Sequence, residues 1–126
     1  RRAVHNLDFS RTRRHGEDPM TDAQRQAVPP VDHPIVRTHP ETGRRSLYLG
    51  DHAEYVVGLP YDEGRAMIET LNAQSIHPDL TYGHRWQNGQ MLVWDNRCVL
   101  HKAAQYDPAT QRRVIRRCTV LGEVPA

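Results

Sequence analysis

The stretch Trp94-Asp-Asn-Arg-Cys-Val-Leu-His101, followed by the basic stretch Gln111-Arg-Arg-Val-Ile-Arg-Arg117, decides the fold of this chain. The first stretch predicts a tight turn and then an apolar strand that contains His101. The second predicts a further strand. Because side chains alternate along a strand, Arg113 and Arg117 are expected on the same face of it. An imidazole and two guanidinium groups would then lie near one another.

Such a grouping suits a site for small dicarboxylates or other organic anions. Arginine binds a carboxylate bidentately through its planar fork and keeps its charge at any physiological pH. A shift of one residue in the loop 102–111 would put Arg112 in the place of Arg113. The basic residues could instead protect the edge of a sheet, and Arg112 and Arg116 on the opposite face fit that role better.

The composition indicates one compact domain and excludes several function classes. The chain has 126 residues, of which 37% are hydrophobic and 25% charged. No apolar run approaches the roughly 20 residues that span a bilayer, so no membrane contact is expected. A net charge of +2 and 6% aromatic residues argue against nucleic-acid binding. Cys98 and Cys118 are expected to be buried free thiols, which favours a cytoplasmic protein; a disulfide between them is the alternative.

The N-terminal third is expected to hold short strands and one irregular excursion. Residues 1–9 include the end of a strand, and residues 10–30 are polar and interrupted by proline and glycine. We expect 10–30 to be a mobile loop or lid, with one helical turn near 21–27 that Thr21 or Asp22 caps. Residues 33–38 and 45–49 read as a hairpin.

The clearest helix follows the ambiguous segment 50–57. Leu59-Pro60 with Asp62 and Glu63 is a start signal, because proline suits the first turn and acids suit the helix dipole there. Apolar residues then recur at helical spacing, and Pro78 ends the helix. They are Met67, Ile68, Leu71 and Ile76.

Short strands joined by turn residues follow the helix. The predicted strands are 81–86, 91–94, 98–104 and 112–121, with turns at 87–90 and 95–96. This pattern is typical of a sandwich or jelly roll. The expected fold is therefore mainly β with a flanking helix.

Several motifs in this order resemble the C-terminal half of an iron(II)- and 2-oxoglutarate-dependent dioxygenase of the taurine dioxygenase/2,4-dichlorophenoxyacetate dioxygenase (TauD/TfdA) family. The similarity is greater to the phenoxyacetate-type branch. It rests on Pro34–Gly43, Gly58–Pro60 with Glu63–Arg65, Arg85-Trp86, Gly89, Trp94–His101, Tyr106-Asp107 and Arg112–Arg117.

The resemblance implies a double-stranded β-helix that couples decarboxylation of 2-oxoglutarate to hydroxylation of a small organic anion by O2. His101 would be the distant histidine ligand of Fe(II). Arg113 would bind the far carboxylate of 2-oxoglutarate, with Trp94 lining the site beside the metal. Arg117 would bind the substrate's carboxylate or sulfonate, and His5 is a further candidate for the substrate pocket.

The family's His-x-Asp/Glu pair lies upstream of the matching region. Three segments here have a similar spacing, at positions that the family does not use for metal: His77-Pro78-Asp79, His39-Pro40-Glu41 and His52-Ala53-Glu54. Residues 1–126 are therefore expected to be the C-terminal portion of one dioxygenase domain. With one protein ligand, this chain alone is expected to be inactive. The alternative is a non-catalytic jelly-roll fragment that binds small anions or mediates oligomerisation, and a homo-oligomer stays open.

Overall fold

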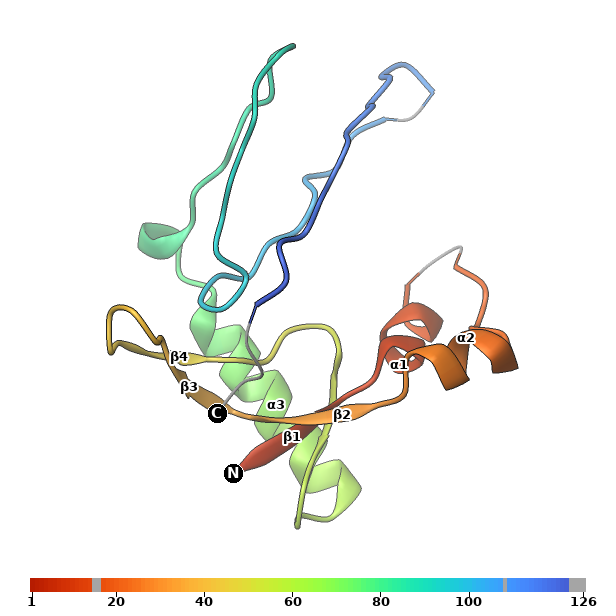
Figure 1. The fold of residues 1–126 in the computed structure, drawn as a ribbon, viewed down its shortest axis with the longest axis vertical. Helices are drawn as coiled ribbons and strands as arrows, with labels where there is room; N and C mark the ends of the chain where they lie inside the picture. The colour runs from red at the N-terminus through yellow and green to blue at the C-terminus, as the bar shows by residue number, and fades with distance from the viewer. Residues whose placement is uncertain (15–16, 108, 123–126) are drawn as a thin grey trace.

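The computed structural model describes residues 1–14, 17–107 and 109–122. Two small sheets and a long helix form the body, and the C-terminal part runs out from it in extended excursions (Figure 1). The elements in chain order are β1 (Arg2–His5), α1 (Leu7–Thr12), α2 (Asp22–Ala27), β2 (Val31–Pro34), β3 (Val36–Thr38), β4 (Arg45–Leu47), β5 (Ala53–Val56), α3 (Tyr61–Ser75) and the 3-10 helix η1 (Pro78–Leu80).

The larger sheet has the order β2-β1-β5, and every neighbouring pair is antiparallel. The register of β1 against β5 shifts between Val4 and His5, which is a bulge. The predicted hairpin is confirmed as β3 and β4, which pair antiparallel from Val36↔Leu47 to Thr38↔Arg45. Its turn ends at Gly43, whose φ of 68° is a left-handed conformation that glycine adopts without strain.

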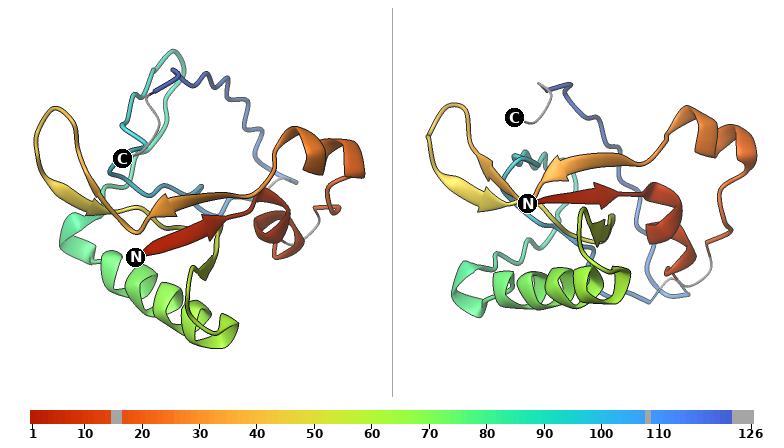
Figure 2. Two further views of the ribbon diagram at one scale, coloured as in Figure 1. Left: turned by 60° about the horizontal axis from the view of Figure 1, so that its bottom comes forward. Right: turned by 90° about the horizontal axis from the view of Figure 1, so that it is seen from below.

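Helix α3 confirms the strongest local prediction and covers one face of the larger sheet (Figure 2). Pro60 is its N-cap residue, and Asp62 and Glu63 lie in its first turn. Gly64 lets the helix approach the sheet, because a Cβ there would lie 2.9 Å from the backbone nitrogen of Val56. The buried core lies between helix and sheet and consists of Ala3, Ile35, Leu49, Ala53, Val56 and Ile68.

The prediction for residues 10–30 was right for one helix and missed another. The helical turn near 21–27 is α2, and Thr21 caps it through a capping box with Gln24. Helix α1 was not predicted, although Asn6 caps it by accepting from two backbone N–H groups. The Asp8 carboxylate joins the two helices, since it accepts from the backbone N–H of Met20 and pairs with Arg25.

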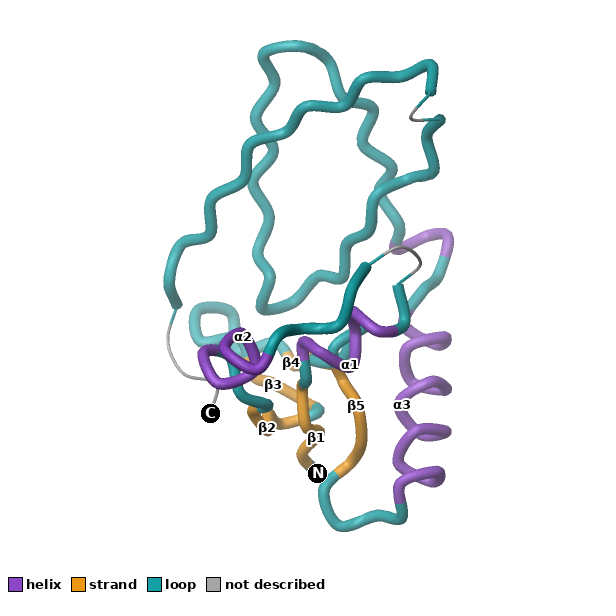
Figure 3. The backbone as a smooth tube through the Cα atoms, turned by 90° about the vertical axis from the view of Figure 1, so that its right-hand side faces the viewer, coloured by secondary structure: helices purple, strands orange, loops and turns teal. Residues whose placement is uncertain are grey.

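The four strands predicted after the helix are wrong for the described residues, because 81–107 and 109–122 contain no strand. These residues form two out-and-back excursions instead (Figure 3). Their backbone hydrogen bonds close turns, as from Gln90 N to Gln87 O and from Cys98 N to Asp95 O. A strand exists only where a second segment completes the ladder, and within the described residues no segment does so here.

The cysteine prediction was right about pairing and wrong about burial. Cys98 and Cys118 are free thiols, and both are exposed. They lie on the excursions, where neighbouring apolar side chains are also exposed: Leu121, for example, is 95% exposed. Among the described residues, no helix is long and apolar enough to cross a membrane.

Candidate functional site

The turn between Trp94 and His101 is held by its own side chains. Asp95 accepts from the backbone N–H of Arg97 at 2.8 Å and binds the Arg97 guanidinium through both carboxylate oxygens. These bonds hold the pKa of the Asp95 carboxyl well below its usual range. The indole N–H of Trp94 donates to the Asn96 side chain at 2.7 Å. This turn fixes the direction in which the chain leaves toward His101.

The structure brings two of the predicted site residues together. The rings of Trp94 and His101 lie with their centroids 5.0 Å apart. The His101 side chain is exposed, and no described residue forms a hydrogen bond or ion pair with it. An exposed imidazole with free ring nitrogens can serve as a metal ligand.

Arg113 lies at a separate cavity of about 390 Å³ on the C-terminal excursion. Its guanidinium carbon is 6.0 Å from the centroid of the Tyr106 ring. Arg112 lines the same cavity, so Arg112 and Arg113 are both still candidates for binding the anion. Arg117 is exposed. Within the described ranges, no polar or ring contact joins either Arg113 or Arg117 to His101.

His5 belongs to a different cluster, on the larger sheet. Its ring stacks on that of Tyr48, with the centroids 5.3 Å apart, and meets the ring of His33 edge-on, with the centroids 5.1 Å apart. The guanidinium carbon of Arg37 lies 4.5 Å from the centroid of Tyr48. Burial, reinforced by the charge of His33, lowers the pKa of His5 to about 4. The buried Nε2 atom has no hydrogen-bond partner among the described residues. The neutral ring is therefore the form that this cluster holds.

The low pKa of His5 predicts acid sensitivity. Well above pH 6.5 the ring is neutral in both states. As the pH falls through 6.5 toward 4, the unfolded chain binds the proton first, so the free energy of unfolding decreases. Replacing His5 by Phe is expected to keep the ring stack and to flatten this decrease. Urea unfolding at a series of pH values measures it, and the exposed His77→Phe is the control for replacing a histidine by phenylalanine elsewhere in the chain. An equal slope in parent and His5→Phe would contradict the assignment.

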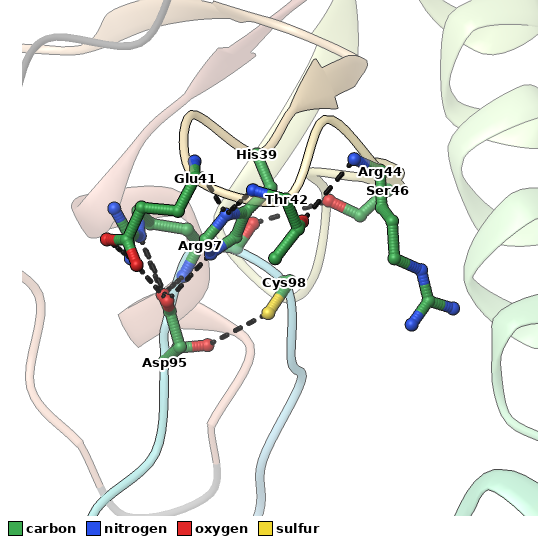
Figure 4. Close-up of polar contacts among 8 residues, drawn as sticks. All are labelled: His39, Glu41, Thr42, Arg44, Ser46, Asp95, Arg97 and Cys98. Atoms are coloured by element: carbon green, nitrogen blue, oxygen red, sulfur yellow. Dashed lines mark hydrogen bonds and ion pairs between the residues drawn. The ribbon is translucent and has the colours of Figure 1, made fainter.

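Sequence reasoning missed a group that the structure places beside the turn. His39 and Glu41, from the turn between β3 and β4, contact Asp95 at 3.0 Å and Arg97 at 3.3 Å (Figure 4). The residues of each pair are 56 positions apart. The only sequence signal was the His-x-Glu spacing of His39 and Glu41, which suggested a metal pair and not this contact.

The family described as "Taurine catabolism dioxygenase TauD, TfdA family" matches residues 1–119. Among curated proteins, the chain is 44% identical over 108 residues to the alpha-ketoglutarate-dependent 2,4-dichlorophenoxyacetate dioxygenase of Cupriavidus pinatubonensis, which covers 86% of this chain and 37% of that protein. It is 32% identical over 126 residues to the (S)-phenoxypropionate/alpha-ketoglutarate-dioxygenase of Sphingobium herbicidovorans, covering 96% of this chain and 44% of that one.

Solved structures agree with this similarity. The structure of AAD-2 in complex with Mn(II) and N-oxalylglycine has a TM-score of 0.74 and 34% sequence identity, and the match covers 89% of this chain and 44% of that one. A putative alpha-ketoglutarate dependent 2,4-D dioxygenase from Burkholderia xenovorans has a TM-score of 0.64 at 38% identity, covering 68% and 33%. The chain thus spans less than half the length of these relatives.

Proposed function

The chain belongs to the taurine catabolism dioxygenase TauD, TfdA family, and on this premise we propose that it is the C-terminal part of an iron(II)- and 2-oxoglutarate-dependent dioxygenase. The substrate is a small organic anion of the aryloxyalkanoate or sulfonate kind. Relatives named for dichlorophenoxyacetate and for sulfate esters support this range. The observation that carries the proposal is the free imidazole of His101 beside Trp94.

The described histidines differ in how well they fit a metal. Both ring nitrogens of His39 are engaged, and His52 Nδ1 lies 2.7 Å from the Ser10 hydroxyl. The unpartnered nitrogen of His5 is buried. His101 is exposed, has no polar partner among the described residues, and ends the motif Trp94–His101, in which the resemblance implies the distant histidine ligand. It fits one of the three protein positions of a 2-His-1-carboxylate site, and the His-x-Asp/Glu pair would supply the other two.

The other site residues would bind and orient the two organic molecules. Iron, when bound, would supply the activation of O2; overall, 2-oxoglutarate loses CO2, one oxygen atom enters succinate and the other enters the substrate hydroxyl. Arg113 would hold the far carboxylate of 2-oxoglutarate in a bidentate pair. Arg117 would bind the acid group of the substrate, and Trp94 would cover the metal side. His5 would contribute an aromatic, uncharged wall to the substrate pocket.

We extend the proposal to the complete fold and its setting. In a protein of the relatives' length, the two excursions of 81–122 would find ladder partners and complete a double-stranded β-helix. The apolar run 91–94 and the strand-favouring residues Val114, Ile115, Thr119 and Val120 support this. Two free thiols support a cytoplasmic setting.

Anaerobic spectroscopy tests the proposed function. Fe(II) and then 2-oxoglutarate are added, without oxygen, to the protein purified at its native length. Chelation of iron by 2-oxoglutarate at an intact site gives a visible charge-transfer band, which we expect. A protein that binds 2-oxoglutarate in equilibrium dialysis but gives no band would be the non-catalytic anion-binding alternative.

Replacing Arg113 by Lys is expected to raise the KM for 2-oxoglutarate by about tenfold or more. Lysine keeps the positive charge but loses the bidentate pair, and a hydrogen bond to a charged group contributes about 1.5–3 kcal/mol. Arg112→Lys is the matched control, since Arg112 lines the same cavity. Succinate formation at a series of 2-oxoglutarate concentrations measures both variants. A larger effect of Arg112→Lys would assign the role to Arg112.

A further inference from the structure

A polar contact fastens the turn that leads to His101 to the body of the protein. We call it the hairpin–turn contact: His39 and Glu41 of the β3–β4 turn against Asp95 and Arg97 (Figure 4). The Ser46 hydroxyl of β4 adds a bond to the Arg97 carbonyl at 3.4 Å. The side chain of His39 is only 11% exposed. The bond between His39 and Asp95 is therefore partly shielded from water, which strengthens it, whereas Glu41 is 75% exposed.

The ring of His39 connects the two sides because each of its nitrogens serves one of them. Nδ1 accepts from the backbone N–H groups of Glu41 and Thr42, at 3.2 and 3.3 Å. A nitrogen that accepts carries no proton, so in the neutral ring Nε2 carries it. Nε2 lies 3.0 Å from the Asp95 carboxylate and donates to it. The Nδ1 edge of the ring thus binds the hairpin turn, and the Nε2 edge binds Asp95.

The same atoms resemble a metal site but do not make one. One ligand atom each from His39, Asp95 and Cys98 lies within 4.8 Å of the others. A metal on Nε2 would require that nitrogen to be unprotonated, while the two backbone donors keep the ring in the opposite tautomer. The Asp95 carboxylate is also already paired with the Arg97 guanidinium through both oxygens. The arrangement is complete without an ion.

We propose that His39 is a positioning residue for His101, acting through Asp95 and the turn that Asp95 closes. The turn lies between Trp94 and His101, and the excursion on either side of it is mostly exposed. Together with the close approach of Leu100 to Gly50, the hairpin–turn contact therefore sets how the Trp94–His101 pair is directed relative to the body. This inference rests on the proposed function in naming His101 as the residue that benefits.

Two substitutions of His39 separate its two roles. In His39→Asn, the amide oxygen can accept from the backbone N–H groups as Nδ1 does, but the donor to Asp95 is lost. In His39→Gln, the longer amide can donate to Asp95, but the turn loses its acceptor. Asp95→Asn removes the carboxylate from the other side and leaves the hairpin unaltered. His77→Asn is the matched control, because Nδ1 of His77 also accepts from a backbone N–H, that of Asp79.

The readout is the freedom of Trp94 in the 126-residue chain, without metal. The chain has two tryptophans, so Trp86→Phe makes Trp94 the single fluorophore. Acrylamide quenching measures the solvent access of the Trp94 indole, and anisotropy decay measures its rotational mobility. We expect His39→Asn and Asp95→Asn to raise the equilibrium constant for release of the turn by about tenfold or more. This is the factor that corresponds to the loss of one hydrogen bond to a charged group. His39→Gln and His77→Asn are expected to match the parent.

The results separate positioning from hairpin stability. If His39 only stabilises the hairpin, His39→Gln will lower the melting temperature and release Trp94 more than His39→Asn does, which overturns the proposal. Parental quenching in both His39→Asn and Asp95→Asn also overturns it. The anaerobic iron experiment is separate: if no charge-transfer band forms while Trp94 still depends on His39, the positioning of the turn stands and the iron assignment of His101 fails.

Discussion

Replacing His101 by Ala in the protein at its native length is expected to abolish iron-dependent succinate formation. His101 is the one proposed iron ligand in this chain, and its exposed imidazole lies beside Trp94. Mutating a residue that only hydrogen-bonds to a metal ligand already lowers metal affinity or activity about 10–100-fold. Loss of the ligand itself should therefore lower both by more than about 100-fold. Succinate formation at saturating 2-oxoglutarate and the affinity for Fe(II) are the two measurements.

His77→Ala is the control for His101→Ala, and it also tests the rival His-x-Asp spacing. His77 is exposed, and its Nδ1 lies 3.6 Å from Asp79 within the same short helical segment. We expect activity and iron affinity close to the parent in this variant. Retained turnover in His101→Ala, or loss of iron binding in His77→Ala, would overturn the ligand assignment.

Replacing Ile68 by Ala is expected to have the largest effect on stability. Ile68 is 0% exposed and lies in the core cluster, between α3 and the sheet. Removing it leaves a cavity that the surrounding side chains fill only in part, which lowers the free energy of unfolding by about 2–5 kcal/mol. The midpoint of urea unfolding, followed by the circular dichroism of α3, measures the change.

Ile76→Ala makes the same chemical change at an exposed site. Ile76 follows the last residue of α3 and is 67% exposed. Its replacement is expected to alter the free energy of unfolding by no more than about 0.5 kcal/mol. Equal losses in the two variants would mean that the core does not lie where α3 meets the sheet.

Local signals predicted the elements whose stabilising contacts are close in sequence. Helix α3 has its proline and acidic residues at the start and apolar residues at helical spacing. The β3–β4 hairpin has its turn residues directly between its strands. Helix α1 was also within reach, because Asn6 is a strong capping residue. The secondary structure of 50–57 could not be predicted locally, since β5 is a strand only through its pairing with β1, far away in the chain.

Within the candidate site, the same distinction holds. Trp94 and His101 belong to one motif, and their ring contact follows from its turn. The prediction that Arg113 and Arg117 share a strand face depended on a ladder that the described residues do not form. Their roles therefore remain predictions for the variants above.

By itself the sequence determined the long helix, the hairpin and the motif that ends in His101, because each depends on residues within one short segment. It also determined the family, because several short motifs occur in the same order. Only the tertiary structure decided that His39 meets Asp95, that His5 stacks on Tyr48, and that 81–122 has no strands among its described residues. The physical reason is that a local signal acts through neighbouring backbone groups. A contact across 56 positions, or a ladder, depends on where the rest of the chain places the second partner.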